Sequence, residues 1–140
     1  MKKTTAQNTL AIVWGGFFLI ILPWSVLWAV NSYFSEKTKD IVNWVTQSSL
    51  PYILLILTVY FSSKKSTKIQ YTDRWAFVLA LVLSLAYIFF VLGVCYALAK
   101  AQFLSQNPMK VIENTNMFST FFQVALSLVF GFYFANSAKK

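Results

Sequence analysis

The chain has 140 residues, of which 58% are apolar and 11% charged, with a formal net charge of +8 and no histidine. Ordinary soluble domains contain about 45–50% apolar and about 25% charged residues, so this composition excludes that class and favours a membrane protein. The single cysteine, Cys95, excludes an intramolecular disulfide.

The charged residues are confined to the ends of the chain and to three short loops. The 12 basic and four acidic residues all lie outside four long uncharged stretches. A bilayer crossing needs about 20 mostly apolar residues, and its backbone must form its hydrogen bonds internally. The sequence therefore predicts one integral membrane domain over 1–140, an all-α bundle of four transmembrane helices at about 10–30, 41–63, 75–99 and 114–136.

The basic residues also predict the orientation of these helices. The two terminal tails and the loop after residue 63 carry eight Lys and Arg residues, whereas the other two loops carry four. The positive-inside rule then places both termini in the cytoplasm and makes successive helices antiparallel (N-in/C-in). In the middle loop, Lys64, Lys65, Lys68 and Arg74 serve as this topology signal, and they could also attract anionic lipid headgroups.

The first stretch, 10–30, could be a secretory signal peptide or a retained helix. Its apolar run of 21 residues exceeds the usual signal-peptide core of about 7–15 residues, which favours a retained helix. Pro23 predicts a kink, because proline removes a backbone donor and clashes with the preceding turn. Gly15 and Gly16 predict close approach of a neighbouring helix.

The second stretch, 41–63, is polar in its first half and strongly apolar only after Leu50. It fits one helix kinked at Pro51, or an interfacial helix followed by a short span. We favour the single helix, because it preserves the topology that the charges predict. In that helix one face collects several polar residues, namely Asn43, Thr46, Gln47 and Thr58, together with Leu54.

The third stretch, 75–99, carries small residues at every fourth position, in two sets. These are Ala76, Ala80 and Ser84, then Gly93, Ala97 and Ala101. Such spacing lets helix backbones approach closely in lipid.

The fourth stretch, 114–136, carries a stripe of polar or small residues along one helix face. The stripe consists of Asn116, Ser119, Thr120, Gln123, Ser127 and Gly131. An amide such as that of Gln123 is not expected to face lipid unpaired. Two interpretations stay open: a packing seam, with Gln123 bonded to Gln47 or Thr58, or a water-filled path in a homo-oligomer, lined by Asn116, Thr120, Gln123 and Ser127.

The sequence offers little for catalysis. Glu36, Asp40, Asp73 and Glu113 all lie in loops or at span ends, so no titratable group is placed for a proton relay within the membrane. Metal ligands are equally sparse, and no nucleophile in the spans has a nearby base. We therefore expect no enzyme activity, no metal or other cofactor, and no nucleic-acid partner.

Known four-span families give no diagnostic motif. Gly15 and Gly16 continue as Phe17-Phe18-Leu19 rather than as the fluoride-channel pattern, and the membrane glutamate of small multidrug transporters is missing. In size, charge and hydropathy the chain is similar to phage holins, immunity proteins against pore-forming toxins, and membrane effectors of phage defence.

The Met1-Lys2-Lys3 opening and the use of lysine over arginine favour a bacterial inner membrane, and the uncharged spans favour a non-enzymatic protein that acts through assembly. The leading expectation is a homo-oligomeric pore for ions, lined by the fourth span. The alternative is a non-conducting accessory or immunity-type subunit whose stripe packs on another membrane protein. A third hypothesis is a regulator of the lipid surface that acts through the middle basic loop.

Overall fold

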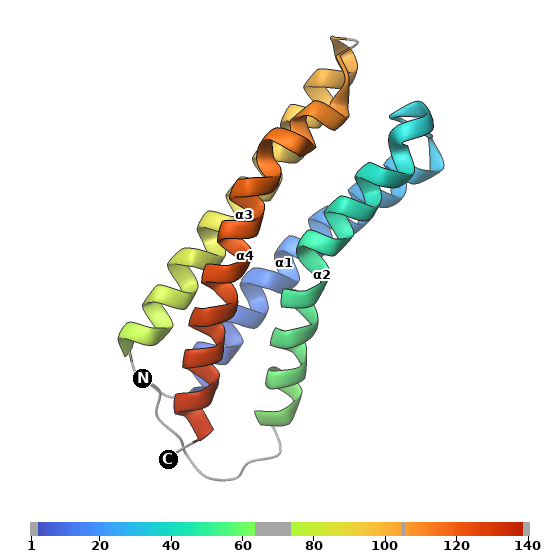
Figure 1. Ribbon diagram of the computed structural model, residues 1–140. Helices are drawn as coiled ribbons and strands as arrows, with labels where there is room; N and C mark the ends of the chain where they lie inside the picture. Colours follow the sequence, from blue (N-terminus) through green and yellow to red (C-terminus); the bar gives the residue numbers. More distant parts are fainter. Residues whose placement is uncertain (1–2, 64–73, 105, 139–140) are drawn as a thin grey trace.

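The protein is built almost entirely from helices. The computed structural model describes the backbone over residues 3–63, 74–104 and 106–138, and the side chains over 5–57, 74–104 and 106–131. The helices are α1 (Lys3–Val30), α2 (Thr38–Ser63), α3 (Arg74–Phe103) and α4 (Pro108–Ala138), and a short 3-10 turn, η1 (Ser35–Lys37), precedes α2 (Figure 1). The predicted all-helical fold class is confirmed.

The four helices form two hairpins. Helix α1 packs along α2, and α3 packs along α4, whereas contacts between the hairpins, from α1 to α3 and from α2 to α4, are fewer. Both hairpin turns lie at the same end of the molecule, and α1 begins at the end where α4 finishes (Figure 1). The two hairpins therefore pack less extensively against each other than the helices pack within each hairpin.

The turn between α1 and α2 is formed by serine and aromatic residues. Ser32 and Ser35 adopt left-handed backbone conformations, with φ of 46° and 55°. The Tyr33 N–H donates to the Trp28 carbonyl at 3.1 Å, which closes the end of α1. The Thr38 hydroxyl accepts from the Phe34 N–H at 3.0 Å, so it ties the residue before the 3-10 turn to the first residue of α2.

The turn between α3 and α4 ends in a helix cap. The Asn107 side-chain oxygen accepts from the Met109 N–H at 3.0 Å, and Pro108 occupies the first helical position, where its missing N–H costs nothing. This explains why α4 begins six residues before the fourth uncharged stretch.

Replacing this cap provides a first test of the turn. We expect Asn107→Ala to lower the free energy of unfolding by about 1 kcal/mol, because an orphan N–H loses its acceptor. Unfolding in mixed detergent micelles measures the change. Asn114→Ala, at an exposed position within α4, is the matched control and should change stability little; an equal loss in both variants would contradict the capping role.

Neither proline interrupts its helix. Helix α1 runs through Pro23 and α2 runs through Pro51. Of the two alternatives for the second stretch, the structure has the single continuous helix. Figure 1 shows α2 changing direction about midway along its length, which is where Pro51 lies by number, and a missing N–H is an established cause of such a bend.

The glycines do not mark close helix contacts within the chain, so that expectation is wrong for Gly15 and Gly16. A Cβ atom added at any of the four glycines would meet no heavy atom within 4 Å. On α3 the two sets of small residues differ: Ala76, Ala80 and Ser84 are buried, whereas Gly93 is exposed.

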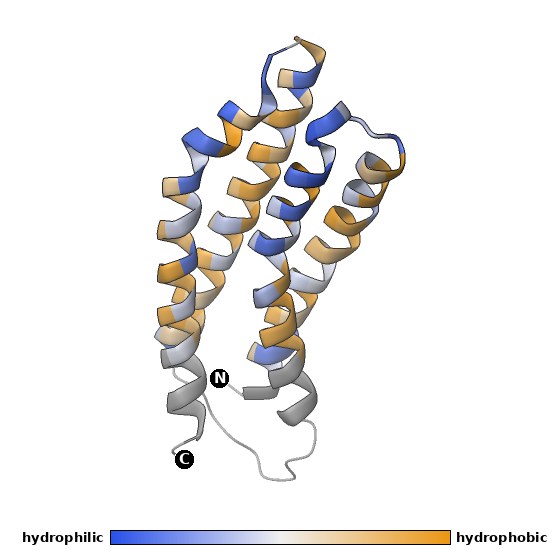
Figure 2. Ribbon diagram, turned by 45° about the vertical axis from the view of Figure 1, so that its right-hand side comes forward, coloured by the Kyte–Doolittle hydropathy of each residue, from blue (hydrophilic) through white to orange (hydrophobic). Residues whose placement is uncertain are grey.

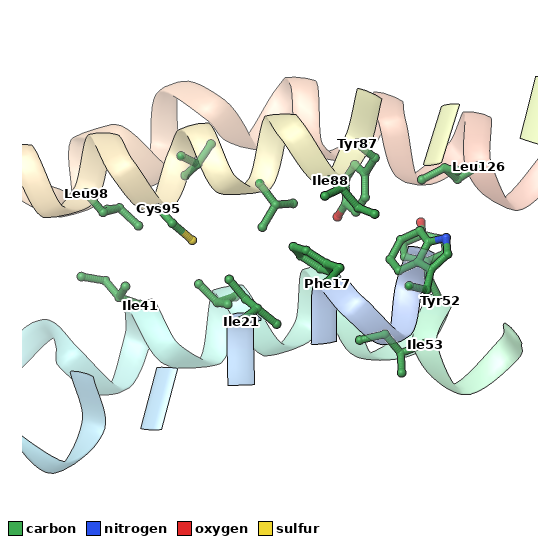
Figure 3. Close-up of a cluster of buried hydrophobic side chains, with 14 of the residues drawn as sticks. Phe17, Ile21, Ile41, Tyr52, Ile53, Tyr87, Ile88, Cys95, Leu98 and Leu126 are labelled. Atoms are coloured by element: carbon green, nitrogen blue, oxygen red, sulfur yellow. The ribbon is translucent and has the colours of Figure 1, made fainter. Parts of the chain in front are cut away.

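The centre of the molecule is an aromatic cluster to which every helix contributes (Figure 3). Trp14 of α1 lies 5.4 Å from Tyr52 of α2, 6.3 Å from Tyr87 of α3 and 6.4 Å from Phe130 of α4, measured between ring centroids. Aliphatic side chains continue this core toward the turns, where Ile41 lies opposite Leu98 (Figure 3). The core thus joins the two hairpins.

The outer surface is strongly apolar. Two helices, over Thr5–Val30 and Arg74–Phe103, are long and apolar enough to cross a membrane. Only 22% of the apolar window of α1 and 39% of that of α3 is buried, whereas the core helix of a soluble protein would be mostly buried. Figure 2 shows hydrophobic residues along most of α3 and hydrophilic residues in the first half of α2. Within the described residues, α2 and α4 are less apolar than α1 and α3 and do not meet the same criterion for a membrane-crossing helix.

Candidate functional site

The polar stripe of α4 lies at the edge of the interface with α2. Ser119 is buried and Gln123 is half-buried, whereas Asn116, Thr120 and Ser127 are exposed. The stripe therefore has an inner edge that packs within the chain and an outer edge that does not.

The inner edge meets two tyrosines. The Tyr52 hydroxyl donates to the main-chain carbonyl of Gln123 at 3.0 Å. The Gln123 amide itself donates to the Ser119 hydroxyl of its own helix, at 3.4 Å. The structure thus does not pair Gln123 with Gln47, which is exposed, and the side chain of Thr58 lies outside the described residues.

The second tyrosine binds a carbonyl beside the bend of α2. The Tyr87 hydroxyl donates to the Ser48 carbonyl at 2.7 Å, and the side chains of Ser119 and Gln123 also approach this hydroxyl. Pro51 cannot donate to the carbonyl of Gln47, four residues earlier, and the carbonyl that Tyr87 binds is the next one along the helix. Tyr87 thus joins the polar stripe to α2.

The outer edge has one further link to α2. The Trp44 indole N–H donates to the Asn116 side-chain oxygen at 3.2 Å, and the Thr120 hydroxyl donates to the Asn116 carbonyl at 3.0 Å. Gln47 and Ser127 are exposed. We use the name α2–α4 polar edge for four exposed polar residues, Gln47 of α2 and Asn116, Thr120 and Ser127 of α4.

The other polar residues of α2 lie elsewhere. Asn43 and Thr46 line an open pocket beside the α1–α2 turn, together with Glu36 and Lys39. In the continuous helix they lie within one arc with Gln47, as expected, and the pocket places Asn43 and Thr46 beside residues of the turn that follows α1. Thr46 satisfies its hydroxyl by donating to the Val42 carbonyl at 2.8 Å.

Most of the basic residues of the middle loop have no described position. Lys64, Lys65 and Lys68 lie outside the described residues, and Arg74 is exposed at the first position of α3. In the part of the chain that the structure describes, no three metal-ligating side chains gather. Cys95 is buried.

Sequence reasoning identified the stripe but missed its partners, Trp44, Tyr52 and Tyr87. A tyrosine far from the ends of an apolar span was the available signal, because a buried hydroxyl requires an acceptor. Comparisons with protein families, with curated proteins and with solved structures find no match for the chain, so the functional proposal rests on the geometry of the α2–α4 polar edge.

Proposed function

We propose that the chain is an integral membrane protein in which all four helices cross the bilayer as an antiparallel bundle, with both termini in the cytoplasm. The apolar exposed surfaces of α1 and α3 support this proposal. Helices α2 and α4 contain 26 and 31 residues, which gives each about 39 Å or more at 1.5 Å per residue and exceeds the hydrocarbon thickness.

Hydroxyl groups on the helices also support a lipid environment. Those of Ser25 and Thr46 donate to carbonyls three or four residues earlier in their own helices, at 2.9 and 2.8 Å. Such bonds satisfy a hydroxyl where no water is present. A bacterial inner membrane fits the lysine-rich loops and remains part of this proposal.

We further propose that several copies assemble around their α2–α4 polar edges and form a water-filled path for ions. The observation that carries the proposal is the exposure of Gln47, Asn116, Thr120 and Ser127 beside an otherwise apolar surface. The amides of Gln47 and Asn116 would cost several kcal/mol if left in hydrocarbon, so these two side chains favour contact with water or with a second protein surface. Uncharged polar rings would give the path weak ion selectivity.

The test compares two exposed threonines in reconstituted protein. We expect Thr120→Leu to lower ion flux at least tenfold, because it places an apolar group in the path, while the oligomer remains. Thr46→Leu is the matched control, since Thr46 is also exposed and bonds to its own helix, and its flux should match the wild type. Unchanged flux in Thr120→Leu would contradict the pore.

The second candidate is a non-conducting accessory or immunity-type subunit. Its support is the inner edge of the stripe, because Ser119 is buried and Gln123 bonds to it within the chain, as in a packing seam. A purified chain that stays monomeric, conducts no ions and becomes ordered only with a membrane partner would favour this candidate.

A further inference from the structure

Among the described residues, side-chain hydrogen bonds join the two hairpins. Tyr52 of the first hairpin donates to the second, Tyr87 of the second donates back to the first, and Trp44 donates to Asn116. These bonds supplement the interface with fewer backbone contacts, since α1 and α3 pack mainly on their own hairpin partners. These hydrogen bonds and the shared aromatic core hold the hairpins to each other.

The same interface buries polar atoms that have no partner. The Gln7 amide, the Trp14 indole N–H and the Ser84 hydroxyl are buried and make no hydrogen bond within the described part of the chain. Gln7 follows Ala6, which packs in one cluster with Ala76 and Phe77 of α3, and Trp14 contacts Tyr87, so both residues lie near the other hairpin. A buried donor or acceptor without a hydrogen-bond partner lowers the stability of the packed hairpins. Contact with water would give all three polar groups a partner.

From these observations we infer that the hairpins α1–α2 and α3–α4 are rigid units that separate along their shared interface, with the hydrogen bonds of Tyr52, Tyr87 and Trp44 as the latch. Separation admits water to Gln7, Trp14 and Ser84. The inference rests on the proposed function in one respect: the separated arrangement is the conducting state, and the described arrangement is the closed state.

The first experiment locks the interface reversibly. Figure 3 shows Cys95 of α3 in the interface, facing the hairpin that carries Ile21 and Ile41. In Ile41→Cys, a short bifunctional thiol reagent cleavable by dithiothreitol links position 41 to Cys95. We expect the link to reduce ion flux at least tenfold and dithiothreitol to restore it. Ile41→Cys combined with Cys95→Ser, treated identically, should conduct throughout.

The second experiment does not depend on conduction. Tyr52→Phe combined with Tyr87→Phe removes two latch bonds while keeping both rings. Cys95 is fully buried, so its labelling by a small maleimide in membranes reports separation, and we expect labelling to accelerate about fivefold to thirtyfold. Tyr96→Phe, at an exposed tyrosine on the same helix, is the control and should label like the wild type.

The outcomes separate the two proposals. Equal flux with and without the link, in protein shown to be linked, would overturn hairpin separation and leave the pore intact. A wild-type chain that never conducts would overturn the pore, and the labelling rates alone would then decide: acceleration in the double tyrosine variant supports separation, and an unchanged rate overturns it.

Discussion

Placing lysine at both Val82 and Phe89 is expected to prevent stable insertion of the chain into membranes. The two residues lie two turns apart on α3 and are 56% and 71% exposed. If α3 crosses the bilayer, both ammonium groups lie near its centre, at a cost of about 2.5–3.5 kcal/mol each. The measurement is the fraction of protein that resists alkaline extraction from membranes, which should fall at least tenfold.

The control places the same charge at the end of the same helix. Phe103, the last residue of α3, is 83% exposed, and Phe103→Lys should insert normally, because a terminal lysine reaches the interface. In a soluble protein, exposed lysines at 82 and 89 would be harmless. Normal expression of the double variant in the soluble fraction would therefore contradict a membrane-spanning α3.

Trp14→Ala is expected to lower the free energy of unfolding by about 3–5 kcal/mol, because truncating a buried tryptophan leaves a large cavity. Trp14 is 1% exposed and contacts aromatic rings from the three other helices. The cavity would therefore open where all four helices meet. Denaturant titration in mixed micelles, read by tryptophan fluorescence or by circular dichroism, measures this loss.

Trp75→Ala tests whether that loss comes from burial. Trp75 is 81% exposed at the start of α3, so its truncation removes a similar side chain without opening a cavity. We expect a loss of less than about 1 kcal/mol. Similar losses for Trp14→Ala and Trp75→Ala would show that the aromatic cluster does not hold the hairpins together.

The positions of the helices could be predicted from charge and hydropathy, but most of their beginnings could not. The structure begins α1 at Lys3 and α4 at Pro108, before the uncharged stretches at 10–30 and 114–136. An apolar run marks the part of a helix that is suited to lipid. The helix itself extends beyond that run into polar residues, as far as a capping residue; for α4 this residue is Asn107, at its beginning.

The partners of the polar stripe could not be predicted for a different reason. Helical periodicity places Ser119 and Gln123 on one face of α4, but it does not say which helix lies against that face. The pairing depends on how large rings fit together, and Tyr52 and Tyr87 occupy the space where Gln47 was expected. The amide of Gln123 therefore bonds to Ser119 on its own helix.

The aromatic cluster also constrains how the chain is made. Trp14 and Tyr52 are synthesised long before Phe130, and the 78 positions that separate Tyr52 from Phe130 take roughly 4–16 s to translate at about 5–20 residues per second. During that interval the first hairpin has no second hairpin against which to pack its rings. Until the second hairpin is made, the aromatic rings of α1 and α2 lack their final packing partners. A chaperone, an insertase or another nascent copy can bind them during that interval.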